Sequence, residues 1–163
     1  MNRRLSLSLI AVILIAAPAF ASKAEDAARY TKILKSSKIT SEKITAAIEI
    51  GKLATIRKSY GKEAIPYLFE ACKDKDANLR AAAAEALGRA YSEDDNKAVE
   101  TLHDMLKSDK SDAVRVAVIN GLVAQGIKAK EVIPTLRKIV QDEPKSRVAG
   151  AARNAVRTLS QMK

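Results

Sequence analysis

Four polar residues in the middle of the chain have the spacing of a calcium-binding loop. They match ligand positions 1, 3, 5 and 12 of a loop that holds Ca²⁺ with carboxylate and amide oxygens: Asp74, Asp76, Asn78 and Glu85. Position 6 of that loop needs a glycine for its sharp turn, and this chain has Leu79 there. Residues 79–87 also carry apolar side chains at helical spacing. The sequence therefore predicts a helix at this place, and we expect neither a metal nor a cofactor.

Two other side chains with reactive potential occur once each. Cys72 lies on an apolar stripe with Ile65 and Leu68, which predicts a buried packing residue and no disulfide within the chain. His103 leaves a single imidazole for acid–base chemistry and excludes a multi-histidine metal site. The chain has no Gly-rich phosphate loop and no nucleophile elbow. These observations predict a protein that is not an enzyme.

The elements that hold these residues are repeated along the chain. Apolar positions such as Leu79, Val114 and Val148 recur with a period of roughly 34 residues. Within each unit they are three and four positions apart, which is typical of two amphipathic helices joined by a polar turn. A fixed period in this range indicates a solenoid, whose stacked units bury a core that one unit cannot bury alone. We predict an all-α, right-handed superhelical solenoid of about four helix pairs.

Residues at helix starts support this division. Pro66 and Pro134, two repeats apart, are placed in the first turn of a helix, where proline removes no hydrogen bond. Asp76 and Ser111 precede the second helices of their units and are predicted to be N-caps.

Two arginines open second helices at equivalent positions. Arg80 and Arg115 follow turns that contain Asp76 and Asp112. We predict that both arginines brace the turns through charge contacts, a structural role.

These features resemble the HEAT repeat in its short bacterial form. The first full unit matches its pattern most closely, with Ile65-Pro66-Tyr67-Leu68, Asp74-Lys75-Asp76, Leu79-Arg80 and Ala83-Ala84-Glu85-Ala86-Leu87-Gly88. The second unit has Glu100 in place of the proline, and the third has Ala149 in place of the arginine. The resemblance implies a degenerate N-terminal cap (residues 22–61) and three repeats (residues 62–95, 96–129 and 130–163).

The N-terminal segment, residues 1–21, has the organisation of a signal peptide. Arg3 and Arg4 precede an apolar run over residues 7–16, and Ala19-Phe20-Ala21 is a small-residue cleavage site. Cleavage after Ala21 would leave a repeat domain of residues 22–163 in the periplasm or the medium. An uncleaved anchor is the alternative, and the paired arginines leave general secretion and twin-arginine export both open.

The charge of the chain favours an acidic partner. Two of its 29 lysines and arginines, Arg3 and Arg4, lie in the N-terminal segment, so residues 22–163 keep 27 of them against 19 acidic residues, a net charge of +8. Export removes nucleic acid as a target, and aromatic residues for base stacking are few. Two partners remain, an acidic protein segment or an anionic membrane or wall polymer. A third interpretation is that the lysines only keep the surface soluble.

The resemblance also implies where a partner would bind, because second helices usually line the concave face of HEAT-like arrays. Projection by the repeat offset gives the candidate groove: Val116, Ile119, Asn120, Val123, Arg153, Asn154 and Arg157. Its apolar part would receive a partner helix, and its two arginines, which are one helical turn apart, would hold an acidic group. The alternative is that Val116 and Ile119 pack against a neighbouring repeat. We expect an exported, non-catalytic adaptor; envelope binding and a bilin-lyase-like enzyme, an activity of some HEAT-like proteins, are the other interpretations.

Overall fold

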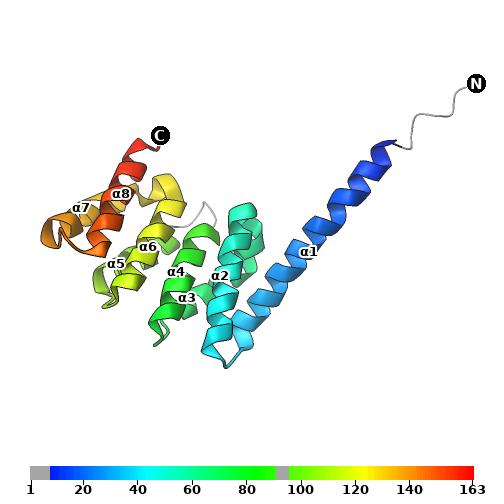
Figure 1. The fold of residues 1–163 in the computed structure, drawn as a ribbon, viewed down its shortest axis with the longest axis horizontal. Coiled ribbons are helices and arrows are strands. Elements are labelled where there is room, and N and C mark those ends of the chain that lie inside the picture. Colours follow the sequence, from blue (N-terminus) through cyan, green and yellow to red (C-terminus); the bar gives the residue numbers. More distant parts are fainter. Residues whose placement is uncertain (1–7, 91–95) are drawn as a thin grey trace, which may run out of the picture.

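The fold is described from a computed structural model of the 163-residue chain. The structure describes the backbone of residues 8–90 and 96–163, and the side chains of these ranges from residue 22 onward. Within these ranges the chain forms helices and turns and no strand. In chain order the helices are α1 (Ser8–Ser36), α2 (Thr40–Ile56), the 3₁₀ helix η1 (Lys58–Ala64), α3 (Ile65–Ala71), α4 (Ala77–Ala90), α5 (Lys97–Ser108), α6 (Asp112–Gln125), the 3₁₀ helix η2 (Gly126–Val132), α7 (Ile133–Asp142) and α8 (Arg147–Gln161) (Figure 1).

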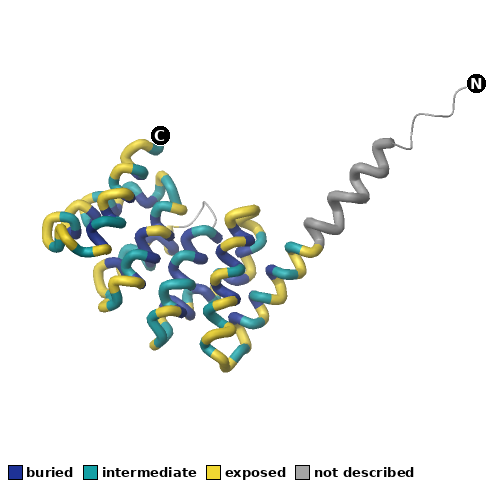
Figure 2. Tube along the Cα trace, viewed as in Figure 1, coloured by how far each residue is buried: buried dark blue, intermediate teal, exposed yellow. Residues whose placement is uncertain are grey.

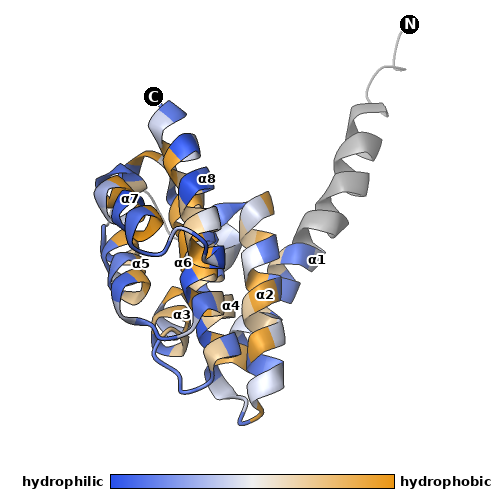
Figure 3. Ribbon diagram, turned by 60° about the vertical axis from the view of Figure 1, so that its left-hand side comes forward, coloured by the Kyte–Doolittle hydropathy of each residue, from blue (hydrophilic) through white to orange (hydrophobic). Residues whose placement is uncertain are grey.

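Successive helices pair and stack into two layers. The second helices α2, α4, α6 and α8 pack side by side, and α3, α5 and α7 form the other layer (Figure 3). The turns within the pairs lie along one edge of the stack (Figure 1), which we call the turn edge. The predicted all-α HEAT-like solenoid is therefore confirmed.

The core lies between the two layers (Figure 2). Leu68, Leu102 and Leu136, which occupy equivalent positions in the three repeats, are 0% exposed and contribute one side of it. Cys72 belongs to this core with 4% exposure, and burial raises the pKa of its thiol to about 12. The thiol therefore stays protonated and packs as a small apolar group, which confirms its predicted structural role.

Backbone contact fixes the spacing of the second helices α4 and α6. A Cβ atom on Gly88 would overlap the backbone of Gly121, and one on Gly121 would lie 2.7 Å from the carbonyl oxygen of Ala84. Side chains do not tolerate such distances. The alanine-rich sequence of α4 allows this approach because its side chains end at Cβ.

The helix starts behave as their residue types predict. The Asp76 carboxylate accepts hydrogen bonds from the backbone nitrogens of Asn78 (2.8 Å) and Leu79 (3.1 Å), and the Ser111 hydroxyl caps α6. Pro66 and Pro134 stand in the first turns of α3 and α7. These predictions are confirmed.

Two features at the joints between repeats were not predicted. The 3₁₀ helices η1 and η2 precede α3 and α7 and bury Ala64 and Ala129. Each carries the chain from the end of a second helix to the start of the next pair. Helix η1 runs across the boundary predicted between residues 61 and 62.

The predicted signal peptide, residues 1–21, lies outside the residues whose side chains are described. Among the described residues, no helix combines the length and the hydropathy that a membrane crossing needs.

The contact between α4 and α6 leads to a stability prediction. G88A should lower the free energy of unfolding by about 2 kcal/mol or more, because its methyl group would overlap the α6 backbone. G150A in α8 is the matched control, since a Cβ there meets nothing within 4 Å and alanine favours helix by about 0.5–1 kcal/mol. Urea denaturation measures both. Equal effects of the two changes would mean that α4 and α6 are not in backbone contact.

Candidate binding surface

The structure divides the predicted groove into exposed, partly buried and buried positions. Asn120, Arg153, Asn154 and Arg157 are exposed, Val116 and Val123 pack against the core while keeping part of their surface, and Ile119 is 1% exposed. The prediction that Ile119 contacts a partner is therefore wrong. Helix α6 has α4 on one side and α8 on the other, so its apolar surface is mostly used for stacking.

The two arginines of α8 remain available for a ligand. The Ser146 hydroxyl accepts a hydrogen bond from the backbone nitrogen of Ala149 (2.9 Å) and so caps the helix that presents them. Arg153 donates to the carbonyl of Pro144 (3.1 Å), and Arg157 donates to the side-chain oxygen of Asn154 (3.5 Å). Within the part of the chain that the structure describes, neither guanidinium is neutralised by a carboxylate.

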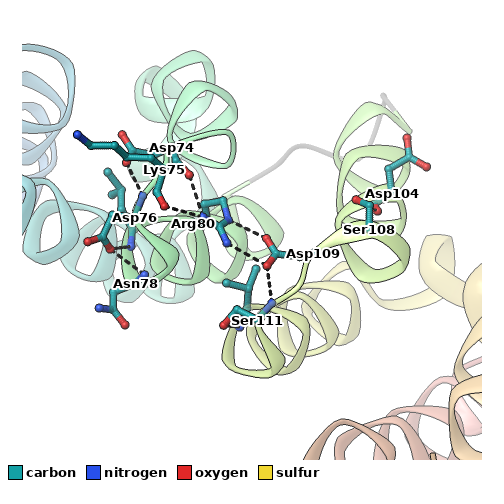
Figure 4. Close-up of polar contacts among 11 residues, drawn as sticks. Asp74, Lys75, Asp76, Asn78, Arg80, Asp104, Ser108, Asp109 and Ser111 are labelled. Carbon is teal, nitrogen blue, oxygen red and sulfur yellow. Dashed lines mark hydrogen bonds and ion pairs between the residues drawn. The ribbon is translucent and has the colours of Figure 1, made fainter.

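A second polar system joins the turns of successive repeats. Arg80 forms a bidentate pair with Asp109 in the next turn, with distances of 2.7 Å from Nε and 3.0 Å from Nη2 (Figure 4). Its Nη1 donates to the carbonyls of Asp74 and Lys75 in its own turn, both at 3.0 Å. One guanidinium therefore holds two turns together.

The next repeat has a similar arrangement with fewer contacts. Arg115 pairs with Glu143 in the following turn and lies 3.5 Å from Asp112. We call the two contacts, Arg80 with Asp109 and Arg115 with Glu143, the arginine ladder. The hydrogen bonds from these arginines hold the pKa of Asp109 and of Glu143 below their usual values.

The predicted bracing role of Arg80 and Arg115 agrees with these contacts, but the sequence analysis did not identify the main partner of Arg80. Asp76 caps helix α4 and lies in the same turn, whereas the carboxylate that holds Arg80 is Asp109. The sequence signal for this partner was present and missed. Acidic residues recur at equivalent positions of successive turns, Asp74, Asp109 and Glu143.

The single histidine has a structural contact. His103 Nε2 lies 2.7 Å from the hydroxyl oxygen of Thr135 and is partly buried, so it links α5 to α7.

The four residues with the spacing of a calcium-binding loop do not form one. Helix α4 begins at Ala77 and includes Asn78 and Glu85, where such a loop would need a turn. The described side chains contain no group of three or more histidines, cysteines and carboxylates placed to hold a metal ion.

Stacked helix pairs with a continuous core and charge-bridged turns define the class of α-solenoid repeat proteins. The sequence model of HEAT repeats matches residues 28–109 and, overlapping them, residues 90–157, and the chain therefore belongs to the HEAT repeat family. Domains of this family are generally scaffolds for protein–protein interaction. A search of curated proteins found no match to the chain.

The ladder makes stability depend on pH. D109N should lower the free energy of unfolding by about 2 kcal/mol at pH 7, because it leaves Arg80 without its charged acceptor. The folded pKa of Asp109 is below its usual value of 3.8, so the contribution is complete above that value and is lost as pH falls through the folded pKa. The gap between wild type and D109N should therefore narrow at pH 2 in urea titrations.

D142N is the control for this comparison. Asp142 is exposed, and its ion pair with the exposed Lys138, at 3.5 Å, is a weak surface contact. D142N should change stability by less than about 0.5 kcal/mol. A loss in D109N no larger than that of D142N would contradict the bracing role.

The ladder can also be extended. Lys43 is the fourth residue of α2, as Arg80 is of α4, and Asp74 stands one repeat before Asp109, so K43R should place a guanidinium against Asp74. We expect a gain of about 0.5–1 kcal/mol in unfolding free energy, which should disappear in a D74N background. A double-mutant cycle in urea measures the coupling, and zero coupling would show that α2 lies out of register with the ladder.

Proposed function

We propose that this protein is an exported, non-catalytic scaffold that holds an acidic segment of another protein against the exposed face of α6 and α8. The observation that carries the proposal is the pair Arg153 and Arg157. Both are exposed on one face of α8, and both have only neutral acceptors among the described residues. The turn arginines of the ladder are instead paired with carboxylates, so they are not available to a partner.

The neighbouring surface suits a peptide more than a small molecule. Asn120 and Asn154 offer amide groups that can donate to and accept from a peptide backbone. Val116 and Val123 add partly exposed apolar area beside them. An extended or helical acidic segment would use the arginines for orientation and rate of capture, and the amides and valines for residence time.

Export is supported by the sequence of residues 1–21, whose basic start, apolar run and small-residue site are those of a signal peptide. The excess of lysine and arginine over acidic residues in the rest of the chain then favours acidic partners of the envelope.

The proposal is tested by charge reversal with a matched control. R153E/R157E should weaken capture of the partner from an envelope extract by at least about tenfold, equivalent to about 1.4 kcal/mol, because two attractive contacts become repulsive. The melting temperature should not change, since both side chains are exposed.

R137E/K138E is the control, with the same change in net charge on exposed residues of α7. It should leave capture intact. Equal loss in both variants would mean that only net charge matters, and no loss in either would remove the face of α6 and α8 as the binding surface.

A further inference from the structure

A cavity at the turn edge is lined by positive charge. It has a volume of about 570 Å³ and lies between the α1–α2 turn and the α3–α4 turn. Its basic residues are Lys35, Lys43, Lys73 and Lys75, and we call it the lysine hollow. These lysines come from the end of α1, the first turn of α2 and the segment that joins α3 to α4.

The next pair of turns encloses an equivalent cavity of about 560 Å³, and the comparison shows what the lysine hollow lacks. In the second cavity Arg80 crosses between the turns and pairs with Asp109. The corresponding position in α2 is Lys43, which is the fourth residue of its helix as Arg80 is of α4, and Lys43 forms no ion pair with a described residue. The first gap between turns is therefore left without its internal arginine.

The charges that line the lysine hollow do not cancel. Its two carboxylates are Glu70 and Asp74, so the four lysines leave a net charge of +2. Asp74 also accepts a hydrogen bond from the backbone nitrogen of Asp76 (2.9 Å). None of the four ammonium groups forms an ion pair with a described residue, and Lys35 lies over the ring of Tyr67 at 5.5 Å. A hollow with this balance attracts a dianion.

The residue types favour phosphate over carboxylate. Arginine presents a planar fork that matches a carboxylate, as Arg80 does with Asp109, whereas lysine acts as a point charge that can approach a phosphate oxygen from any side. A phosphate monoester has several oxygens and two charges, enough for four ammonium groups around it. The Tyr67 ring supplies an apolar wall for the rest of the ester.

We infer that the lysine hollow binds the phosphate group of a phosphomonoester. This site is at the turn edge and is separate from the face of α6 and α8, so it stands or falls independently of the scaffold proposal. The ester belongs either to a soluble metabolite or to a lipid headgroup, and the binding chemistry is the same.

The inference is tested first by ligand titration of the ¹⁵N-labelled full chain. At pH 8 glycerol 3-phosphate is a dianion, since the second pKa of such an ester is about 6. It should shift the amide signals of Lys43, Tyr67 and Lys75 in a saturable manner. Succinate, a dianion with carboxylates, should bind at least about tenfold more weakly at equal ionic strength. Equal binding of succinate would overturn the assignment to phosphate.

Two double variants locate the site. K43Q/K75Q should weaken glycerol 3-phosphate binding by at least about tenfold, while K128Q/K130Q, which removes the same charge from η2, should leave it unchanged. Circular dichroism checks that both variants fold. Equal losses in the two variants would reduce the effect to net charge and overturn the site.

Vesicles distinguish the two sources of the ester. Cosedimentation with phosphatidic acid vesicles, absent with phosphatidylcholine and lost in K43Q/K75Q, would support a lipid headgroup. Binding of glycerol 3-phosphate without vesicle binding would support a soluble ester. Failure of both probes would overturn the inference.

Discussion

The backbones of α4 and α6 touch where Gly88 meets Gly121, and this contact sets the geometry of the stack. No side chain fits between them, so the distance between these second helices is fixed by main-chain atoms. That distance in turn sets the separation of the turns that precede the two helices, and it brings Asp109 within reach of Arg80. The leucines of the core fill the space that remains between the layers. Small residues therefore fix the spacing, and the larger side chains adapt to it.

At this fixed spacing, the arginine ladder sets the register between neighbouring repeats. Each guanidinium reaches forward to the next turn, so the contacts have a direction along the stack. Partly exposed ion pairs add modest energy, but a bidentate arginine tolerates little displacement, and it specifies one alignment of neighbouring repeats. Where α2 has Lys43 in place of an arginine, this specification is missing, and Lys43 lines the lysine hollow instead. In the N-terminal cap, the residues at the turn edge are therefore not held in the arginine ladder and can bind a ligand.

Much of this fold could be predicted from the sequence, because its signals are local. The period, the first-turn prolines and the cap at Asp76 each depend on residues within a few positions of one another. The errors concern relations between repeats. Projection by the repeat offset places Ile119 in the candidate groove, whereas its burial agrees with the alternative, that it packs against a neighbouring repeat. The partner of Arg80 lies in the next turn, and only the recurrence of acidic residues at Asp74, Asp109 and Glu143 indicates it. In the predicted binding surface, Arg153 and Arg157 of α8 are exposed, as expected for charged side chains outside the apolar stripe of a helix.

The two layers differ in stiffness, and this difference gives the array a preferred way to deform. The layer of α4 and α6 cannot be compressed where their backbones touch. The layer of α3, α5 and α7 packs mainly against its own partners, with the bond between His103 and Thr135 as a cross-link between α5 and α7. Bending will therefore pivot about the contact between Gly88 and Gly121 and change the distances between α3, α5 and α7. A load applied to the face of α6 and α8 changes the curvature of the whole array while each helix pair stays rigid.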